Sequence, residues 1–372
     1  MVFRSSSNSN YGTATKTVVD PAKKFNFETE LGSGAFATVY KVTDRVTHKV
    51  SAIKKLLPDA TGALPIQEYE LAKSLKHVNI VRTLDCFVFE NVMFLQLELM
   101  NGGDLFTKLD PSGNGIDESI AAKYMKQLAE GVGHLHSVGI VHCDIKPENV
   151  LLHNNVIKIC DLGLAGKAGS ERTGASTGTG AYMAPELINR RSSTPYTIET
   201  ANDVWSLGIV LYAVLFADLP WEKAKPRDKD FHLFCRKGGV SAKLHPFHFT
   251  SPKMRTFLSR LLHIVPKNRP TMAEVATFFD DSKTPWFVAA RQSLDISYGL
   301  KEAPAAPAPV QPQWDTESVG SSRSSVSSLP EMMTDLFVSE QPLPVVDKRS
   351  PQKTRGSIDR TSEMIAAAIR LC

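Results

Sequence analysis

The sequence has few cysteines and no pattern that would make a disulfide or metal framework of them. Only five of its 372 residues are cysteine, and none of them stands in a Cys-x-x-Cys pair. An odd number of scattered cysteines argues against a disulfide-stapled domain and against a structural zinc site. We therefore expect free thiols in a reducing compartment.

The sequence also lacks a segment with the length and apolarity of a membrane span. Its longest apolar run, from Val204 to Leu219, is interrupted by Ser206 and Asp218, which favours a buried helix. The first ten residues are rich in Ser and Asn and contain no apolar stretch typical of a secretory signal. We expect no attachment to a membrane.

Charge of one sign is not in large excess either. The chain has 43 Lys and Arg against 39 Asp and Glu, a formal net charge of +4. This balance does not by itself indicate a nucleic-acid partner. With 42% hydrophobic and 22% charged residues, the composition is that of a globular protein with one large or two-lobed folded unit. We expect a monomer that binds no nucleic acid.

The two ends of the chain lack the apolar periodicity of folded segments. Residues 1–24 are polar and predict a disordered extension, so the folded region is expected over residues 25–290. Residues 291–372 are rich in Pro and Ser and predict a largely disordered regulatory tail. For the short apolar groups in this tail, a loose tail is the preferred interpretation, and docking motifs for regulatory partners are the alternative. The basic cluster after Lys348 favours a nuclear signal or, equally, a solvated tail.

Residues 25–100 have the pattern of a small sheet with one helix. Apolar and polar residues alternate near residues 25–31, 39–42 and 50–54, which is the period of half-buried strands. Two more strands are expected over residues 84–89 and 93–99. Helical spacing over residues 68–75 separates them from the first three. We predict an antiparallel sheet with one helix.

From residue 119 onward the apolar period becomes that of helices. Ile120, Tyr124, Leu128, Val132 and Leu135 follow one another at helical spacing and predict one apolar helix face. Further helices are expected near residues 203–216, 253–264 and 271–280. Residues 101–290 therefore predict a mainly α-helical lobe. The whole is an α+β architecture of two lobes, which suits a ligand cleft between them.

A glycine-rich segment joins the first two expected strands. It contains Gly32, Ser33 and Gly34, and Val39 follows at the start of the next strand. Glycines allow backbone amides to approach phosphate oxygens closely, so this segment is a candidate phosphate cradle. A plain turn is the alternative, since Ala37 stands where nucleotide-binding loops of this spacing usually have a third glycine.

Lys54 ends an apolar strand segment and needs a carboxylate partner. A buried ammonium group without a counter-charge is costly. Glu68 and Glu70 on the next helix are the candidates, and helical spacing places Glu68 on the inward face. We predict the pair Lys54–Glu68, with an ordinary surface ion pair as the alternative.

The most specific motif is the segment from His142 to Leu152. Asp144, Lys146 and Asn149 stand in the pattern D-x-K-x-x-N, and Asp161 follows Asn149 by twelve residues in Asp-Leu-Gly. Phosphoryl transfer needs a carboxylate for the attacking hydroxyl, a cation near the phosphoryl group and oxygen ligands for Mg²⁺. We assign Asp144 to the first role, Lys146 to the second, and Asn149 with Asp161 to the metal.

Together with Ala184-Pro185-Glu186, these motifs resemble the eukaryotic protein kinase family over about residues 25–290. The resemblance implies the two-lobe kinase fold, with the first lobe at about residues 25–100 and the second at about 101–290. It also implies ATP and Mg²⁺ as cofactors and transfer of the γ-phosphate to protein substrates. Lys146 within Asp-Ile-Lys-Pro-Glu-Asn resembles the serine/threonine type. Arg269 matches the family's usual partner of Glu186.

Within the family, the segments Gly102–Phe106 and Leu219–Trp221 resemble the calmodulin-dependent-kinase-like group, particularly checkpoint effector kinases. This implies cell-cycle or damage signalling in the cytoplasm, the nucleus or both. The alternative is a pseudokinase, a kinase-fold scaffold without catalysis. It would be indicated by loss of Lys54, Asp144 or the metal-binding residues, all of which are present.

The resemblance also implies a nucleotide site. Glu98 and Met100 would present hinge backbone groups to adenine, Leu97 would be the gatekeeper and Leu151 the floor under the base. The expected nucleotide-binding residues are Leu31, Gly32, Ser33, Gly34, Val39, Ala52, Lys54, Glu98, Met100, Asp104 and Leu151. Asp104 and Glu148 match positions that often favour a basic residue three before the phosphoacceptor, and carboxylates at a cleft mouth attract arginine.

Two positions depart from the family's pattern. Cys143 replaces the arginine that normally pairs with a phosphorylated residue of the activation segment. We therefore predict that phosphorylation between residues 170 and 177 is not the main on-switch. Leu162 replaces phenylalanine, and we expect it to pack against His142 with little loss of function. The segment's hydroxyl candidates for phosphorylation are Ser170, Thr173, Ser176 and Thr177, and an unmodified flexible lid is the alternative.

Overall fold

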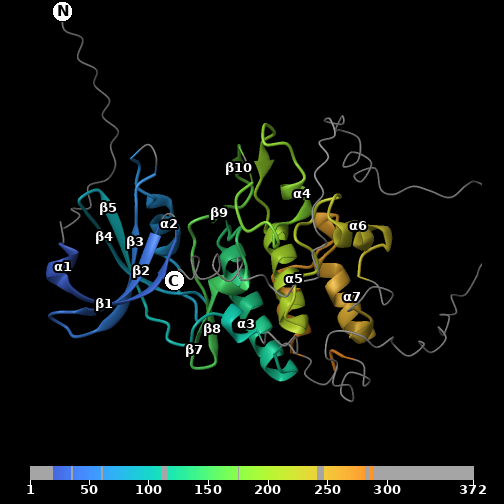
Figure 1. Ribbon diagram of the computed structural model, residues 1–372, viewed down its shortest axis with the longest axis horizontal. Coiled ribbons are helices and arrows are strands. Elements are labelled where there is room, and N and C mark those ends of the chain that lie inside the picture. Colours follow the sequence, from blue (N-terminus) through green and yellow to red (C-terminus); the bar gives the residue numbers. More distant parts are fainter. Residues whose placement is uncertain are drawn as a thin grey trace, which may run out of the picture.

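The protein is described from a computed structural model that covers residues 20–34, 37–59, 62–109, 116–174, 176–240, 247–280 and 285–287. Figure 1 shows a lobe built on a sheet beside a larger lobe built mainly of helices. The α+β two-lobe architecture predicted from the sequence is confirmed. The expected tail, residues 291–372, lies outside the described residues, as do residues 1–19 of the expected N-terminal extension.

The smaller lobe holds a five-stranded antiparallel sheet in the order β1-β2-β3-β5-β4. One helix, α2, lies beside it in the left half of Figure 1. The elements are β1 (Phe25–Ser33), β2 (Ala37–Asp44), β3 (Val50–Leu56), α2 (Ile66–Ala72), β4 (Thr83–Phe89) and β5 (Val92–Leu97).

The register of the sheet places Lys54 among apolar neighbours. Val39 on β2 pairs with Lys54 on β3, and Ala52 on β3 pairs with Leu97 on β5. Lys54 and Ala52 are two apart on β3 and face the same side of the sheet, and paired residues on neighbouring strands share that side. Val39, Ala52 and Leu97 therefore belong to one buried cluster. The Lys54 side chain lies on the same side of the sheet as this cluster and contacts Glu68 on α2.

A short helix differs from the expected start of the folded region. The helix α1 (Pro21–Lys24) lies within the stretch for which we predicted disorder. Asp20 caps it by accepting a hydrogen bond from the Ala22 N–H at 3.0 Å, and proline at the first helical position favours the turn. Local capping, which hydrophobic periodicity does not register, accounts for the difference.

The larger lobe has six helices and three strand pairs among its described residues. The helices are α3 (Glu118–Ser137), α4 (Pro185–Ile188), α5 (Thr200–Phe216), α6 (Lys229–Arg236), α7 (Pro252–Leu261) and α8 (Met272–Phe278). The strand pairs are β7 (Val150–His153) with β8 (Val156–Ile159), β6 (Ile140–Val141) with β9 (Gly166–Lys167), and β10 (Glu171–Arg172) with β11 (Tyr196–Thr197). The 3₁₀ turns are η1 (Phe106–Lys108), η2 (Pro147–Asn149), η3 (Phe247–Phe249) and η4 (Pro266–Asn268).

The helix α3 begins where Asp117 accepts hydrogen bonds from the backbone N–H groups of its first turn. Tyr124, Leu128 and Val132 are buried along its inner face, as their spacing predicted. Ile120 was expected on the same face but is 45% exposed. Its neighbour Ala121 in the same turn is 1% exposed. The buried face of α3 therefore includes Ala121 and not Ile120, so periodicity alone placed the edge of this face wrongly.

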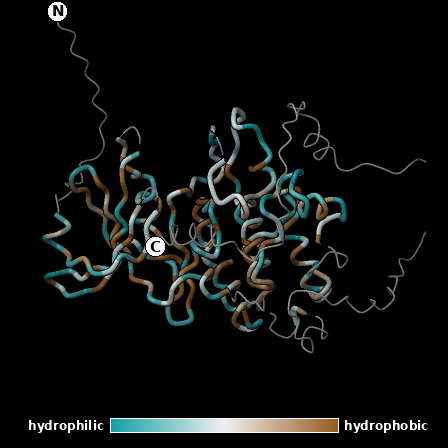
Figure 2. The backbone as a smooth tube through the Cα atoms, in the orientation of Figure 1, coloured by the Kyte–Doolittle hydropathy of each residue, from teal (hydrophilic) through white to brown (hydrophobic). Residues whose placement is uncertain are grey.

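The helix α5 is the core of this lobe. Every residue from Asn202 to Phe216 is buried, in agreement with the interpretation of the long apolar run as a buried helix. Figure 2 shows hydrophobic segments in the interior of both lobes and hydrophilic turns at their surface. Among the described residues, no helix combines the length and apolarity that crossing a bilayer requires.

Candidate active site

Lys54 lies between two carboxylates that come from different parts of the chain. Its Nζ donates to Glu68 Oε1 at 2.7 Å and to Asp161 Oδ1 at 2.8 Å. Lys54 is on β3, Glu68 on α2, and Asp161 follows β8, so the contact joins the two lobes. Of the two candidates for the lysine's partner, the structure selects Glu68, because Glu70 contacts Lys73 instead.

The two carboxylates compete for one ammonium group. Burial raises the pKa of Glu68, and the charge of Lys54 only partly offsets this. Burial would also raise the pKa of Asp161, but Lys54 and the Gly163 N–H lower it to about 2. Asp161 is therefore ionised at neutral pH and available as an anionic ligand.

The catalytic-loop residues predicted from the motif lie together. The Nζ of Lys146 is 2.8 Å from Asp144 Oδ2. The side-chain amide of Asn149 donates to the backbone oxygen of Asp144 at 2.9 Å and to its Oδ2 at 3.2 Å. All three residues are buried. The 3₁₀ turn η2 brings Asn149 back toward Asp144, which explains the spacing in the motif.

Thr179 completes this group and was not singled out from the sequence. Its N–H donates to Asp144 Oδ1 at 2.8 Å, and its hydroxyl accepts from Lys146 Nζ at 2.8 Å. The aspartate is thus held on both carboxylate oxygens, which fixes its orientation. Thr179 lies between two glycines, Gly178 and Gly180. That arrangement was the available signal of a special backbone position.

Asp203 holds the backbone of the catalytic loop, a role that was not predicted from the sequence. It lies fully buried on α5, where its Oδ2 accepts from the His142 N–H and its Oδ1 from the Cys143 N–H, both at 2.9 Å. His136 contacts the same carboxylate through Nε2 at 2.9 Å. A carboxylate in the first turn of a helix that continues as an apolar run was the signal, because buried charges require partners.

Asn149 and Asp161 fit a Mg²⁺ ion by the chemistry of their donors. The amide nitrogen of Asn149 is used by Asp144, which leaves its side-chain oxygen for another ligand. Asp161 offers an ionised carboxylate. Amide and carboxylate oxygens are the ligands that Mg²⁺ prefers. Their role as metal ligands stays a prediction.

Several of the expected nucleotide-binding residues lie on the strands β1, β2 and β3 of the smaller lobe. Val39 and Ala52 are buried beside Leu97, whereas Leu31 is 37% exposed. Gly32 pairs with Val39 across the hairpin. Ser33 contacts the Thr38 hydroxyl at 3.3 Å.

The Gly34 N–H closes the hairpin of the glycine-rich segment. It donates to the Ala37 carbonyl at 2.9 Å. This amide therefore donates within the hairpin turn. The role of the segment as a phosphate cradle stays a prediction. Residues 35 and 36, between these two positions, lie outside the described residues.

The expected hinge leads from β5 to the larger lobe. The Glu98 N–H donates to the Arg82 carbonyl at 3.0 Å, and the Glu98 carboxylate accepts from the Arg82 N–H at 2.7 Å and from Lys158 Nζ at 2.8 Å. These contacts fix the hinge, and Met100 follows it half-buried. Leu151 is buried and forms a bridge with Asp104.

The two expected acidic residues differ in what they contact. Asp104 accepts a hydrogen bond from the Thr107 N–H, within η1, at 2.7 Å. Glu148 Oε2 is buried without a hydrogen-bond partner within the described ranges. Burial raises the pKa of Glu148, Lys146 opposes this, and the carboxylates of Asp144 and Asp104 raise it further. A buried acceptor of this kind favours a cationic partner.

Two further expectations concern side chains around the site. Glu186 forms a two-point ion pair with Arg269, with Nη1 and Nη2 at 2.7 and 2.8 Å from its carboxylate oxygens, which confirms the pairing implied by the resemblance. Leu162 is buried with Ala72 and Leu135, between the lobes. Its contact with His142 stays a prediction.

Comparison with known proteins identifies the family to which the chain belongs. The family model for the protein kinase domain matches residues 25–279. CBL-interacting protein kinase 2 of Oryza sativa subsp. japonica is 32% identical over 79% of this chain and 65% of its own length. The serine/threonine-protein kinase chk1 of Schizosaccharomyces pombe is 31% identical over 70% of this chain and 53% of its own length.

An Aurora kinase of Yarrowia lipolytica is similar to the same degree. It is 32% identical over 72% of this chain and 69% of its own length. The chain thus spans between about half and two thirds of the length of the curated relatives it matches.

Proposed function

The chain belongs to the protein kinase family, and on this basis we propose that it is an active serine/threonine protein kinase. It transfers the γ-phosphate of ATP to Ser or Thr hydroxyl groups of protein substrates. Nearby relatives that are named serine/threonine kinases support this assignment. So does Lys146, which stands in Asp-Ile-Lys-Pro-Glu-Asn.

The observation that carries the proposal is the assembled set of charges around Asp144 and Lys54. Asp144 is oriented by Thr179 and Lys146, so its carboxylate can position a substrate hydroxyl and accept its proton. Lys54, held by Glu68, is placed to bind phosphate oxygens. ATP with Mg²⁺ supplies the phosphoryl group and neutralises its charge, and Asn149 and Asp161 would hold the metal.

These contacts disfavour the alternative of a scaffold without catalysis. A pseudokinase has lost one or more of the groups that phosphoryl transfer needs. Here Lys54 Nζ and Asp161 Oδ1 are 2.8 Å apart across the lobes, which supports the proposal that these two groups act in one site.

We further propose a preference for a basic residue three positions before the phosphoacceptor. Support comes from Glu148, whose buried Oε2 has no hydrogen-bond partner among the described residues. Asp104 adds to the negative potential that Glu148 senses. An arginine of the substrate would satisfy this acceptor with a charge-assisted hydrogen bond.

We propose a cellular role on the basis of the names of relatives. Similarity to a chk1 kinase and to an Aurora kinase supports a role in checkpoint or cell-cycle signalling, in the cytoplasm, the nucleus or both. Similarity to CBL-interacting kinases supports regulation by partner proteins, for which we propose residues 291–372 as the docking tail. We propose a monomer that acts on proteins, without nucleic-acid or membrane binding.

The proposal is tested by phosphate transfer. The full chain is incubated with labelled ATP, Mg²⁺ and an arrayed peptide library, with Asp144→Asn as the matched control. We expect transfer to Ser and Thr peptides with Arg at position −3. Absence of transfer above the Asp144→Asn level would overturn the enzymatic proposal, and transfer without a preference for Arg would overturn the specificity alone.

A further inference from the structure

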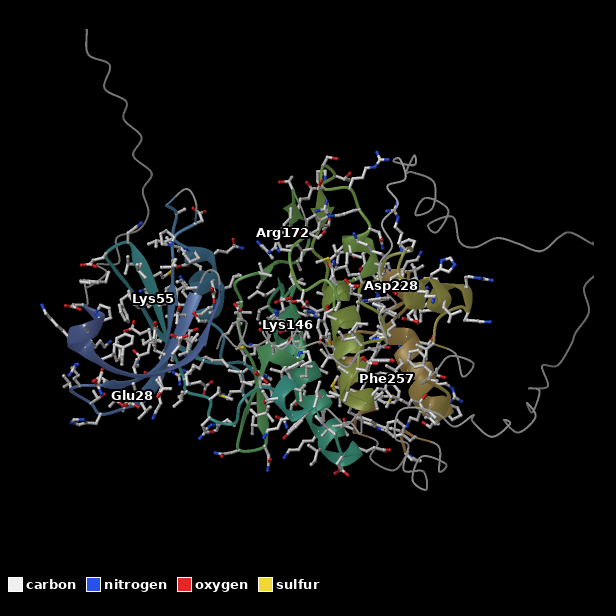
Figure 3. The ribbon with its side chains drawn as sticks, in the orientation of Figure 1. Glu28, Lys55, Lys146, Arg172, Asp228 and Phe257 are labelled. Atoms are coloured by element: carbon white, nitrogen blue, oxygen red, sulfur yellow. The ribbon has the colours of Figure 1, made fainter. Side chains whose placement is uncertain are left out.

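Arg172 lies against both ends of the segment between the Asp161 loop and the Ala184 motif. Its Nη2 donates to the carbonyls of Leu164 and Ala165 at 2.7 and 2.9 Å. Its Nη1 donates to the Thr177 hydroxyl at 3.2 Å. Figure 3 shows Arg172 and Lys146 on the side of the helical lobe nearer the sheet. One guanidinium group thus joins two stretches of chain that the sequence separates.

Each of these stretches leads directly into the catalytic site. Leu164 follows the Asp161–Gly163 turn, in which the Gly163 N–H donates to Asp161 Oδ1 at 3.1 Å. Thr177 stands two residues before Thr179, whose N–H orients Asp144. The Arg172 side chain therefore sets the spacing between the proposed metal-binding carboxylate and the residue that orients the proposed base.

The close approach of Arg172 depends on a glycine beneath it. A Cβ atom at Gly166 would lie 2.7 Å from Arg172 Nη2 and 2.6 Å from Ile198 Cδ1, which is closer than such atoms can approach. Gly166 pairs with Val141 next to the catalytic loop, so the backbone there cannot retreat freely. The absence of a side chain at Gly166 therefore leaves the space that the Arg172 guanidinium occupies.

Cys143 leaves room for the same guanidinium. The thiol lies near Arg172, and burial, with the Asp203 carboxylate, raises its pKa to about 12, so it is neutral. An arginine at position 143 would place a second cation beside Arg172 and repel it. Two carbonyls and a hydroxyl accept hydrogen bonds from Arg172, and the neutral Cys143 thiol is a further partner, so all four are uncharged. The small, neutral side chain of Cys143 is therefore compatible with the charged guanidinium of Arg172 beside it.

A second arginine fixes the rest of the segment. Arg190 Nε donates to the Ser176 hydroxyl at 3.0 Å, and that hydroxyl donates to the Leu187 carbonyl at 2.6 Å. Ser176 therefore serves as a structural contact in this arrangement. The segment is held by arginines bonded to neutral acceptors on both sides of residue 175.

We propose that Arg172 is a positioning residue that holds the segment in its active arrangement without a phosphate group. This inference rests on the proposed kinase function. It goes beyond that function by assigning to one side chain of the segment the work of joining the Asp161 loop to Thr177–Thr179. The unphosphorylated chain is then competent for catalysis.

The test compares the phosphatase-treated full chain with Arg172→Ala, Gly166→Ala and, as a matched control, Arg191→Ala, an exposed arginine of the same lobe. Steady-state kinetics with ATP and a peptide are measured beside hydrogen exchange of peptides covering residues 161–180 and the helices α7 and α8. Exchange does not depend on catalysis, so it reports on Arg172 even if the chain proves inactive. Gly166→Ala displaces the guanidinium without removing it.

We expect Arg172→Ala and Gly166→Ala to lower kcat/KM for the peptide by about 10- to 100-fold, since a shift of about 1 Å in catalytic geometry costs on this order. The KM for ATP of both variants should stay close to that of the phosphatase-treated wild type. Exchange should rise in residues 161–180 and not in α7 or α8, and Arg191→Ala should match the wild type.

Three results would overturn the proposal. One is unchanged kinetics and exchange in Arg172→Ala. Another is exchange that rises equally throughout the lobe, which would show a merely structural role. The third is a wild-type chain that loses activity on phosphatase treatment, because a phosphate would then do the work assigned to Arg172. Lack of transfer by every variant, with the exchange pattern as expected, would count against the kinase function alone.

Discussion

Asp203 accepts a hydrogen bond from the backbone N–H of Cys143 at 2.9 Å. Cys143 has a φ of 67°, a left-handed conformation that side chains other than glycine adopt at a cost. The carboxylate compensates for this strain at the residue just before Asp144. A buried helix of the larger lobe thus controls the backbone of the catalytic loop.

This relationship predicts that Asp203→Asn destabilises the protein. Asparagine keeps the shape but turns an amide N–H₂ toward one of the N–H donors, which leaves a buried donor unsatisfied. We expect the free energy of unfolding to fall by about 1–3 kcal/mol. Urea unfolding measures it, with the exposed Asp230→Asn as control. Equal stability of the two variants would contradict this account.

Cys143→Arg restores the residue typical of the family and should nevertheless lower activity. The new guanidinium would compete for the space beside Arg172 and repel it. We expect kcat to fall by about tenfold or more, because the segment shifts. Cys143→Ser, which keeps a small neutral side chain, should retain most activity. An arginine variant as active as wild type would show that the two positions are not coupled.

Glu148→Gln is expected to change peptide preference rather than turnover. The variant removes the charge and keeps the shape of the buried side chain. The kcat/KM for peptides with Arg at −3 should fall by about tenfold or more, since hydrogen bonds to charged groups contribute about 1.5–3 kcal/mol. Peptides without that arginine should be unaffected. Equal losses for both peptide classes would assign Glu148 to catalysis or folding instead.

His77 predicts a pH dependence of stability. Its ring stacks on His134 with centroids 4.9 Å apart. Burial, and then the proximity of His134, lowers the pKa of His77 below its usual 6.5, with Lys158 acting in the same direction and Glu130 against it. The folded chain therefore binds this proton less readily than the unfolded chain. Stability falls as pH drops below 6.5 and stops falling below the folded-state pKa.

The measurement is urea unfolding of the wild type and His77→Gln between about pH 7.5 and pH 5. We expect the wild type to lose more stability across this range than the variant, which has no proton to bind at position 77. Identical pH profiles would show that His77 does not contribute.

Much of the fold could be predicted because its signals are local. Alternation over residues 39–42 and 50–54 marks strands, and the long apolar run around Val204 marks a buried helix. The partner of Lys54 could also be predicted, since helical spacing distinguishes Glu68 from Glu70 and only the inward residue can neutralise a buried lysine. Ile120 and α1 differ because the exact edge of a buried helix face and local capping do not follow apolar periodicity.

The missed residues share a physical reason. Thr179 and Asp203 contact Asp144 and its neighbours from 35 and 60 positions further along the chain. Nothing near Asp144 in the sequence indicates which distant residues will contact it in the folded protein. Arg172 is the same kind of residue, since its acceptors depend on how the segment between them turns.

The sequence by itself determined which side chains are available for the proposed chemistry. The spacing of Asp144, Lys146, Asn149 and Asp161 requires particular donors at particular positions, and this pattern is carried by residue identity. Only the tertiary structure decided how those groups are held. Asp203 accepts a hydrogen bond from the backbone of the catalytic loop, Thr179 donates to Asp144, and Arg172 packs against Gly166. Each of these contacts joins elements that meet only after the helical lobe has folded.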